Sequence, residues 1–378
     1  MRILLLLAGL LAPWLLVEGF LLATGYEAPD LRTRLALFPS FPKFYEPDRD
    51  LGWKLKPNLD WVGTELVAPF HTDVHGNRRN PFLAAERLPS TVDAIGDSTT
   101  FGYGSTDGQT YPAALQRLLN QDRKEGRTIV VRNLGVPGYS SVEARLIAER
   151  DGHHAPVTLL LIGFIDHFAS IRPRIPSLWM RRAGYTCFES RACSAVFDWA
   201  TWRDPDVPKP SPPAPTSYVP DVPEDRFVYE LTRSVRALRE RGSEPILLVY
   251  PPLAVTESVI QEAATNFNQP EEIVRATVST HPRYQELTRE VARMEKVRMV
   301  DLHPIFETAG NDRLHLDWVH PNADGLSLMA TSVADVVKEE LVKKGHLKAP
   351  PAPKPISTAA PTTRERPRRD AASPVPQS

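Results

Sequence analysis

The stretch VDAIGDSTT, residues 92–100, decides how this chain folds. Its first four residues are mostly apolar and have the length of a buried strand, and a glycine, an aspartate and a serine follow at once. A serine at a tight turn at the carboxyl end of a strand is how an α/β fold exposes a nucleophilic hydroxyl. Asp-Ser-Thr is also ordinary turn and helix-capping chemistry, so this stretch does not establish catalysis by itself.

A carboxylate and an imidazole occur far downstream, in the stretch DWVHPN, residues 317–322. Asp317 and His320 are three residues apart, so they can meet on one turn. A serine hydroxyl needs a base to take its proton, and the base needs a group that fixes its tautomer. The pattern therefore predicts Ser98 as nucleophile, His320 as base and Asp317 as the group that orients the base. A surface histidine before a helix is the alternative for His320, and the paired carboxylate and serine favour catalysis.

Together these stretches resemble the SGNH hydrolases, also called the GDSL esterase/lipase family. That family carries its nucleophile in a Gly-Asp-Ser motif near the start of the domain and an Asp-x-x-His motif near its end. Residues 133–138, NLGVPG, look like the second block of the family, whose last glycine lends an amide to the oxyanion hole. Residues 163–166, GFID, fall where the third block, Gly-x-Asn-Asp, belongs. The resemblance covers residues 90–340, with two insertions.

The resemblance implies an oxyanion hole formed by the backbone N–H groups of Ser98 and Gly138. A third donor is uncertain, because Ile165 stands where the family has its asparagine. Losing one such donor typically costs on the order of 10²–10³ in rate. Asp166 is an acceptor when ionised, and His167 could donate only if its ring pointed inward, so an ordinary loop histidine is favoured. Another donor, a slow enzyme or a protein that is no longer an enzyme all stay open.

Five mostly apolar runs of strand length predict the sheet. They are nearly continuous rather than alternating, as expected for parallel strands covered on both faces. The runs are residues 92–95, 129–134, 157–162, 246–250 and 297–302. Segments with helical spacing lie between them, which predicts an α/β/α three-layer sandwich with a five-stranded parallel sheet, the flavodoxin-like SGNH fold. The motifs follow the carboxyl ends of the runs, where sites form in open parallel sheets.

Two insertions, residues 167–223 and 251–282, begin at this same edge and are expected to be long irregular excursions that overhang the site. A peripheral subdomain is the alternative. The first insertion contains three tryptophans, which we expect to form part of the substrate wall or else the small core of a flap. They are Trp179, Trp199 and Trp202.

The ends of the chain differ in composition from its centre. Residues 3–23 are nearly continuously apolar, and about 21 residues at ~1.5 Å rise would span a bilayer core. We expect residues 1–25 to be a membrane anchor, with a cleaved signal segment as the alternative. Arg2 is the only charged side chain before this stretch, so the rest should be exported. Residues 347–378 are rich in Pro, Ala and Arg and predict a disordered tail.

Two further features of the chain are the segment before the nucleophile and the pair of cysteines. Residues 26–90 predict short strands and turns packed on a catalytic domain of residues 91–346. Cys187 and Cys193 predict a disulfide in an exported chain, and two free thiols are the alternative.

The sequence therefore predicts an exported, membrane-anchored serine esterase that hydrolyses an acyl or acetyl ester of a glycan or a lipid. An O-acyltransferase acting on a cell-envelope polysaccharide, and a catalytically impaired glycan- or lipid-binding protein, are the alternatives. The balance of 45 Lys+Arg against 46 Asp+Glu gives no case for nucleic acid as a partner. No motif indicates a cofactor or a metal, so none is expected. The oligomeric state is left open.

Overall fold

The chain divides into two compact units, Met1–Leu347 and Lys348–Ser378. The second unit, which contains most of the predicted tail, lies outside the described residues. The computed structural model describes residues 2–24, 44–63, 67–82, 91–121, 128–150, 155–168, 192, 217–266 and 269–347.

A five-stranded parallel sheet forms the centre of the first unit, with strand order β6-β5-β7-β8-β9. The strands are β5 (Val92–Gly96), β6 (Val131–Gly135), β7 (Val157–Leu161), β8 (Glu244–Val249) and β9 (Arg298–Asp301). The predicted sheet is confirmed, and each strand lies within the run that predicted it or within two residues of its ends. The register aligns Gly96 at the end of β5 with Gly135 of β6 and Leu161 of β7. The loops that follow these three strands therefore leave the sheet side by side.

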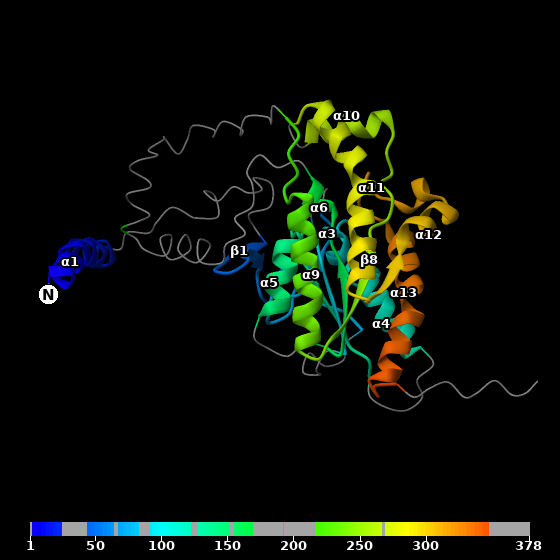
Figure 1. Cartoon of the computed structure of the whole chain (residues 1–378), viewed down its shortest axis with the longest axis horizontal. Coiled ribbons are helices and arrows are strands. Elements are labelled where there is room, and N and C mark those ends of the chain that lie inside the picture. Colours follow the sequence, from blue (N-terminus) through cyan, green and yellow to red (C-terminus); the bar gives the residue numbers. More distant parts are fainter. Residues whose placement is uncertain are drawn as a thin grey trace, which may run out of the picture. The chain divides into compact units, whose positions relative to one another are not determined.

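Helices cover both faces of the sheet. On one face α4 (Tyr111–Asn120) packs against α13 (Ala323–Lys343), and on the other α5 (Ser141–Glu149) packs against α9 (Glu224–Glu240) (Figure 1). Alternate residues of β5 supply the two cores, because successive strand side chains point to opposite faces. Ala94 lies in the core with α4 and α13, and Ile95 lies in the core with α5 and α9. This is the predicted three-layer arrangement.

The second insertion is more regular than expected. It contains α10 (Glu257–Asn266) and the first half of α11 (Glu271–Met294), so the expected irregular excursion is wrong here. Pro282 lies inside α11, yet the helix is unbroken over its 24 residues because one face is buried along its whole length. That face has helical spacing and includes Ile273, Val274, Thr277, His281, Tyr284, Leu287 and Val291. Farther along the chain, α12 (Leu302–Ala309) leads from β9 toward residues 317–320.

The described part of the N-terminal extension forms two small antiparallel pairs. In the first, β1 (Tyr45–Asp48) pairs with β2 (Gly52–Leu55), and in the second β3 (Asp60–Trp61) pairs with β4 (Phe70–His71). Their apolar side chains share one buried cluster with the main sheet, in which Phe70 packs edge-on against Phe101 at 5.0 Å between ring centroids. The side chains of these strands are therefore part of the hydrophobic core on one face of the sheet.

The chain begins with α1 (Arg2–Ala23), which contains Pro13. Among the residues that the structure describes, no helix combines the length and apolarity that a membrane crossing requires. The predicted membrane anchor in residues 1–25 thus finds no support in the structure.

Candidate active site

The predicted nucleophile starts a short helix directly after β5. This helix, α3, spans Ser98–Phe101, and the Asp97 carboxylate caps it by accepting a hydrogen bond from the Thr99 N–H at 2.9 Å. The Tyr250 hydroxyl donates to the same carboxylate at 3.0 Å. Burial raises the pKa of Asp97 to about 6, against the opposing effect of these hydrogen bonds. Asp97 therefore fixes the turn from within the core and places Ser98 at the carboxyl edge of the sheet, where it is largely buried.

Close packing of α3 against β6 requires glycine at residue 135. A Cβ atom there would lie 2.2 Å from the backbone nitrogen of Phe101, closer than side-chain carbons come to backbone atoms. The last glycine of β6 thus lets the nucleophile helix sit directly on the sheet.

Ser98, His320 and Asp317 form a continuous chain of hydrogen bonds. Ser98 Oγ lies 2.8 Å from His320 Nε2, and His320 Nδ1 lies 2.7 Å from Asp317 Oδ2. The other carboxylate oxygen of Asp317 accepts from the backbone N–H groups of Val319 (2.9 Å) and His320 (2.7 Å). The three predicted residues are brought together in the order nucleophile, base and orienting carboxylate.

The electrostatics of Asp317 suit that order. Burial alone would raise its pKa, but the neighbouring His320 charge and the hydrogen bonds from His320 and Val319 outweigh burial and lower the pKa to about 2. Asp317 is therefore ionised at neutral pH, accepts the Nδ1–H of His320, and leaves the Nε2 lone pair facing Ser98.

Gly138, the predicted second amide of the oxyanion hole, lies in a turn beside the nucleophile segment. The Val136 N–H donates to the Gly96 carbonyl at 3.1 Å and the Tyr139 N–H donates to the Val136 carbonyl at 3.1 Å. Gly138 has φ 86°, in the left-handed region that favours glycine. The turn then enters α5, whose N-cap is Ser140.

The third block forms a short helix, α6 (Phe164–His167), whose polar side chains point into the core. Asp166 is fully buried and accepts hydrogen bonds from the Ser141 N–H at 3.0 Å and the Ser141 hydroxyl at 2.5 Å. Ile165 is partly buried against the apolar core. Asp166 thus ties the third block to the start of α5, just after the Gly138 turn.

The expectation that His167 is an ordinary loop histidine is wrong. Its side chain is fully buried, with Nδ1 2.6 Å from the Gly163 carbonyl and Nε2 3.2 Å from His281 Nδ1. His281 Nε2 in turn lies 2.8 Å from the Pro251 carbonyl. Burial, followed by the charge of His281, holds the pKa of His167 well below its usual value. Both ring nitrogens are engaged away from Ser98, so His167 does not replace the missing asparagine either.

The N-terminal extension holds the Gly138 turn from outside, a contact that the sequence did not reveal. The Tyr45 hydroxyl and the Trp53 indole N–H both donate to the Pro137 carbonyl, at 3.2 and 3.4 Å. The Tyr139 hydroxyl donates back to the Trp53 carbonyl at 2.6 Å. Three hydrogen bonds thus join the β1–β2 pair to the residues on either side of Gly138.

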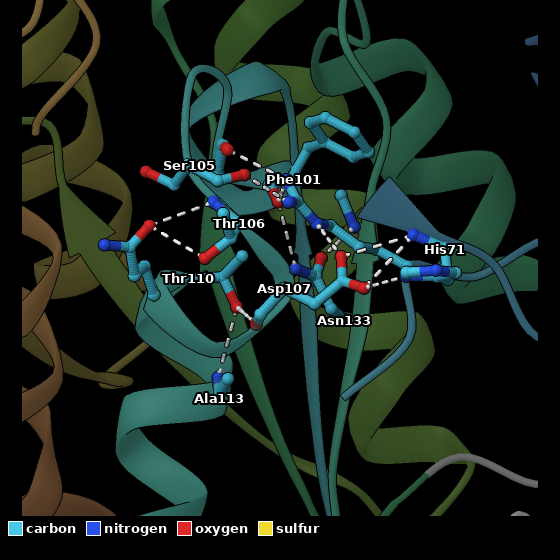
Figure 2. Close-up of polar contacts among 12 residues, drawn as sticks. His71, Phe101, Ser105, Thr106, Asp107, Thr110, Ala113 and Asn133 are labelled. Carbon is cyan, nitrogen blue, oxygen red and sulfur yellow. Dashed lines mark hydrogen bonds and ion pairs between the residues drawn. The ribbon is translucent and has the colours of Figure 1, made fainter. Parts of the chain in front are cut away.

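Arg78 of the same extension holds the segment after the nucleophile helix. Its buried guanidinium donates to the carbonyls of Phe101 (2.9 Å) and Gly102 (2.8 Å), to the Ser105 carbonyl, and to Asp107 Oδ1 (3.0 Å). Figure 2 labels three of these residues, Phe101 at the end of α3 and Ser105 and Asp107 in the segment that follows it. Burial lowers the pKa of Arg78 to about 10 despite its pairing with Asp107. Arg78 remains charged at neutral pH, and its fixed donors suit several carbonyls at once.

The two insertions differ in how far they can be placed. The second touches the active-site turn, because the Ala254 N–H donates to the Trp318 carbonyl at 3.0 Å. Most of the first lies outside the described residues, including the predicted wall tryptophans and the predicted disulfide. Those residues are Trp179, Trp199, Trp202, Cys187 and Cys193. Within the described part of the chain, no group of three or more His, Cys, Asp or Glu side chains could hold a metal ion.

A parallel α/β/α sandwich whose strand ends join serine, histidine and aspartate defines the class of serine hydrolases built on an open sheet. The model of the GDSL-like Lipase/Acylhydrolase family matches residues 94–327, and the chain belongs to this family. It is a serine hydrolase that acts on ester bonds.

Solved structures of similar proteins share little sequence with this chain. A lipolytic protein of the G-D-S-L family from Veillonella parvula is 15% identical, with 65% of this chain and 96% of that chain covered and a TM-score of 0.36. A lipase/acylhydrolase from Enterococcus faecalis is 13% identical (66% and 96% covered, TM-score 0.40). An acetylxylan esterase from Geobacillus stearothermophilus is 16% identical (66% and 96% covered, TM-score 0.40). A search of curated proteins finds no match.

Proposed function

We propose that this protein cleaves an acyl or acetyl ester of a glycan or a lipid through an acyl-serine intermediate, with Ser98 as nucleophile, His320 as base and Asp317 as orienting carboxylate. The observation that carries the proposal is the chain of two hydrogen bonds, 2.8 and 2.7 Å long, that joins these side chains.

The first half-reaction follows from that geometry. His320 Nε2 takes the proton of Ser98 Oγ while the oxygen bonds to the acyl carbon, and the imidazolium then protonates the departing alcohol oxygen. In the second half-reaction His320 takes a proton from water, which attacks the acyl-serine, and returns it to Ser98. The backbone N–H groups of Ser98 and Gly138 donate hydrogen bonds to the developing oxyanion.

Covalent labelling of the full chain tests this assignment. A fluorophosphonate should modify Ser98, and peptide mapping by mass spectrometry should locate the adduct there. His320→Ala should slow labelling by about 10³-fold or more, because the hydroxyl then has no base. Labelling at another residue, or at an unchanged rate in a folded His320→Ala protein, would contradict the proposal.

Ile165 favours one other reading, a catalytically impaired protein that binds a glycan or lipid ester. It lacks a donor at the position of the family's asparagine, so the oxyanion would be one hydrogen bond short. If the parent protein turned over 4-nitrophenyl acetate and Ser98→Ala did not, this alternative would be excluded. An O-acyltransferase would share the acyl-serine, and adding polysaccharide acceptors to the same assay would reveal acyl transfer in place of hydrolysis.

We also propose that the protein acts outside the cytoplasm, either anchored by its N-terminal segment or released after cleavage. The support is the apolar composition of residues 3–23 and the basic Arg2 before them. A fusion of residues 1–30 to alkaline phosphatase, which is active only after export, should be active. An inactive and intact fusion would contradict export.

A further inference from the structure

Tyr103 contacts both the nucleophile segment and the base. Its backbone N–H donates to the Ser98 carbonyl at 2.9 Å. Its ring stacks on the His320 imidazole, with 4.4 Å between ring centroids and 29° between ring planes. One residue thus links Ser98 through its backbone and His320 through its side chain.

The stacking acts on a direction that the hydrogen bonds leave free. Asp317 and Ser98 hold the His320 ring through its two nitrogens, and an imidazole nitrogen directs its N–H or lone pair within the ring plane. They oppose rotation within the plane more strongly than tilting out of it. The Tyr103 ring lies against the imidazole face and opposes that tilt.

The contact also favours the charged form of the base. His320 becomes a cation when it takes the Ser98 proton, and an aromatic face attracts a cation that lies against it. Burial, followed by the negative charge of Asp317, raises the pKa of the Tyr103 hydroxyl, so this ring is neutral at neutral pH. The attraction is therefore absent for neutral imidazole and present for the imidazolium that forms during acylation.

Backbone hydrogen bonds and the Arg78 side chain hold the segment that carries Tyr103. Gly102 has φ 87°, and its N–H also donates to the Ser98 carbonyl at 2.9 Å. Arg78 fixes the carbonyls of Phe101 and Gly102, the two residues before the tyrosine (Figure 2 labels Phe101). The ring is thus placed by a backbone that has little freedom to move.

We propose that Tyr103 is a positioning residue for His320, an inference that rests on the proposed function. Its ring keeps the imidazole in line with Ser98 and stabilises the imidazolium, so that loss of the ring slows acylation without weakening substrate binding.

Two substitutions separate the ring from the hydroxyl. In the full chain, Tyr103→Phe should keep kcat for 4-nitrophenyl acetate within about 2-fold of the parent. Tyr103→Leu should lower kcat and the rate of fluorophosphonate labelling about 10-fold with little change in KM, given the usual strength of a cation held over an aromatic face. Melting temperatures check the fold, and Tyr103→Met takes the place of a leucine variant that does not fold.

A double-mutant cycle tests whether the ring acts through the base. In a His320→Ala background, Tyr103→Leu should leave the residual labelling rate unchanged, because no imidazole remains to position. An equal loss in both backgrounds, or parent-like kinetics of Tyr103→Leu, would overturn the role of Tyr103 while leaving the nucleophile in place. A folded parent protein that is never labelled at Ser98 would instead overturn the proposed function, and this inference with it.

Discussion

The loop after β5 and the loop after β7 leave the same edge of the sheet and use their polar residues in opposite directions. After β5, the Ser98 hydroxyl faces His320, with Oγ 2.8 Å from Nε2. After β7, the side chains of Asp166 and His167 turn inward, to Ser141 and to His281 respectively. Ile165, where an asparagine donor was expected, packs against the apolar core. In this protein the segment after β5 carries the proposed nucleophile, and the segment after β7 joins the elements around it.

Ile165 stands at the position where an asparagine donor was expected, and the residues that support the proposed site are nevertheless in place. Asp166 holds the start of α5 next to the Gly138 turn, while Tyr45 and Trp53 hold that turn through Pro137. The nucleophile side has its own support in Arg78. Four predictions test this division between a reacting loop and a joining loop.

The largest effect is expected from Ser98→Ala. Hydrolysis of 4-nitrophenyl acetate should fall by about 10⁴-fold or more, because the acyl group then has no acceptor oxygen. The melting temperature should change little, since Ser98 makes its side-chain hydrogen bond only to His320 among the described residues. Ser327→Ala, at an exposed position of α13, is the matched control and should keep full activity. Comparable activity in the two variants would place the chemistry elsewhere.

Ile165→Asn should restore a donor to the joining loop. If the oxyanion is one hydrogen bond short, turnover of a short acyl ester should rise about 10-fold or more. Ile165→Leu keeps an apolar side chain of similar volume and should leave turnover near the parent value. A fall in turnover of a folded asparagine variant would show that this loop serves the oxyanion in another way.

Asp166→Ala should act first on stability. It leaves the buried Ser141 N–H and hydroxyl without their acceptor, and an unsatisfied buried donor costs about 1–3 kcal/mol. Urea unfolding should show a loss of about that size in the free energy of unfolding. Ser141→Ala removes only the hydroxyl bond and should cost less. A variant with parent stability and lost activity would make Asp166 part of the reaction instead.

The smallest effect is a change in the acid dependence of stability. Burial lowers the pKa of His281 to about 4; the hydrogen bond to the Pro251 carbonyl opposes this shift, and the charge of His303 adds to it. Burial also lowers the pKa of His167. The unfolded chain, with histidine near 6.5, binds more protons than the native state between pH 6.5 and 4, so stability should fall as the pH is lowered through this window.

His281→Phe should reduce the slope of the unfolding free energy against pH by the equivalent of up to about one bound proton. Urea unfolding at pH 7, 6, 5 and 4 measures this slope. His75→Gln, at an exposed position, is the control and should keep the parent slope. An unchanged slope in His281→Phe would mean that the buried histidine pair does not govern acid sensitivity.

The strands and the candidate catalytic residues could be predicted because their sequence signals are local. Each strand of the sheet lies within two residues of a short, mostly apolar run, and Asp317 and His320 lie within one turn of chain. The length of α11 could not be predicted in this way, since Pro282 interrupts its pattern and tertiary burial overrides the local preference. The burial of His167 could not be predicted for the same reason, because it depends on the packing of α6 against α11.

The supports of the site were outside the reach of sequence reasoning. Arg78 reads as one of many charged residues, and its burial depends on carbonyls that α3 and the following turn present to it. Tyr45 and Trp53 similarly gain their role only when the β1–β2 pair docks on Pro137.

The sequence alone determined the alternation of strands and helices, the carboxyl-edge position of the motifs and the residue types that could react. The tertiary structure alone decided that Ser98 and His320, 222 positions apart, lie within one hydrogen bond, that Tyr103 stacks on the base, and that the third block turns inward. The physical reason is the distance along the chain over which each kind of interaction acts. Hydrophobic periodicity and turn chemistry act over a few residues, whereas a contact of 2.8 Å depends on how every layer of the sandwich packs.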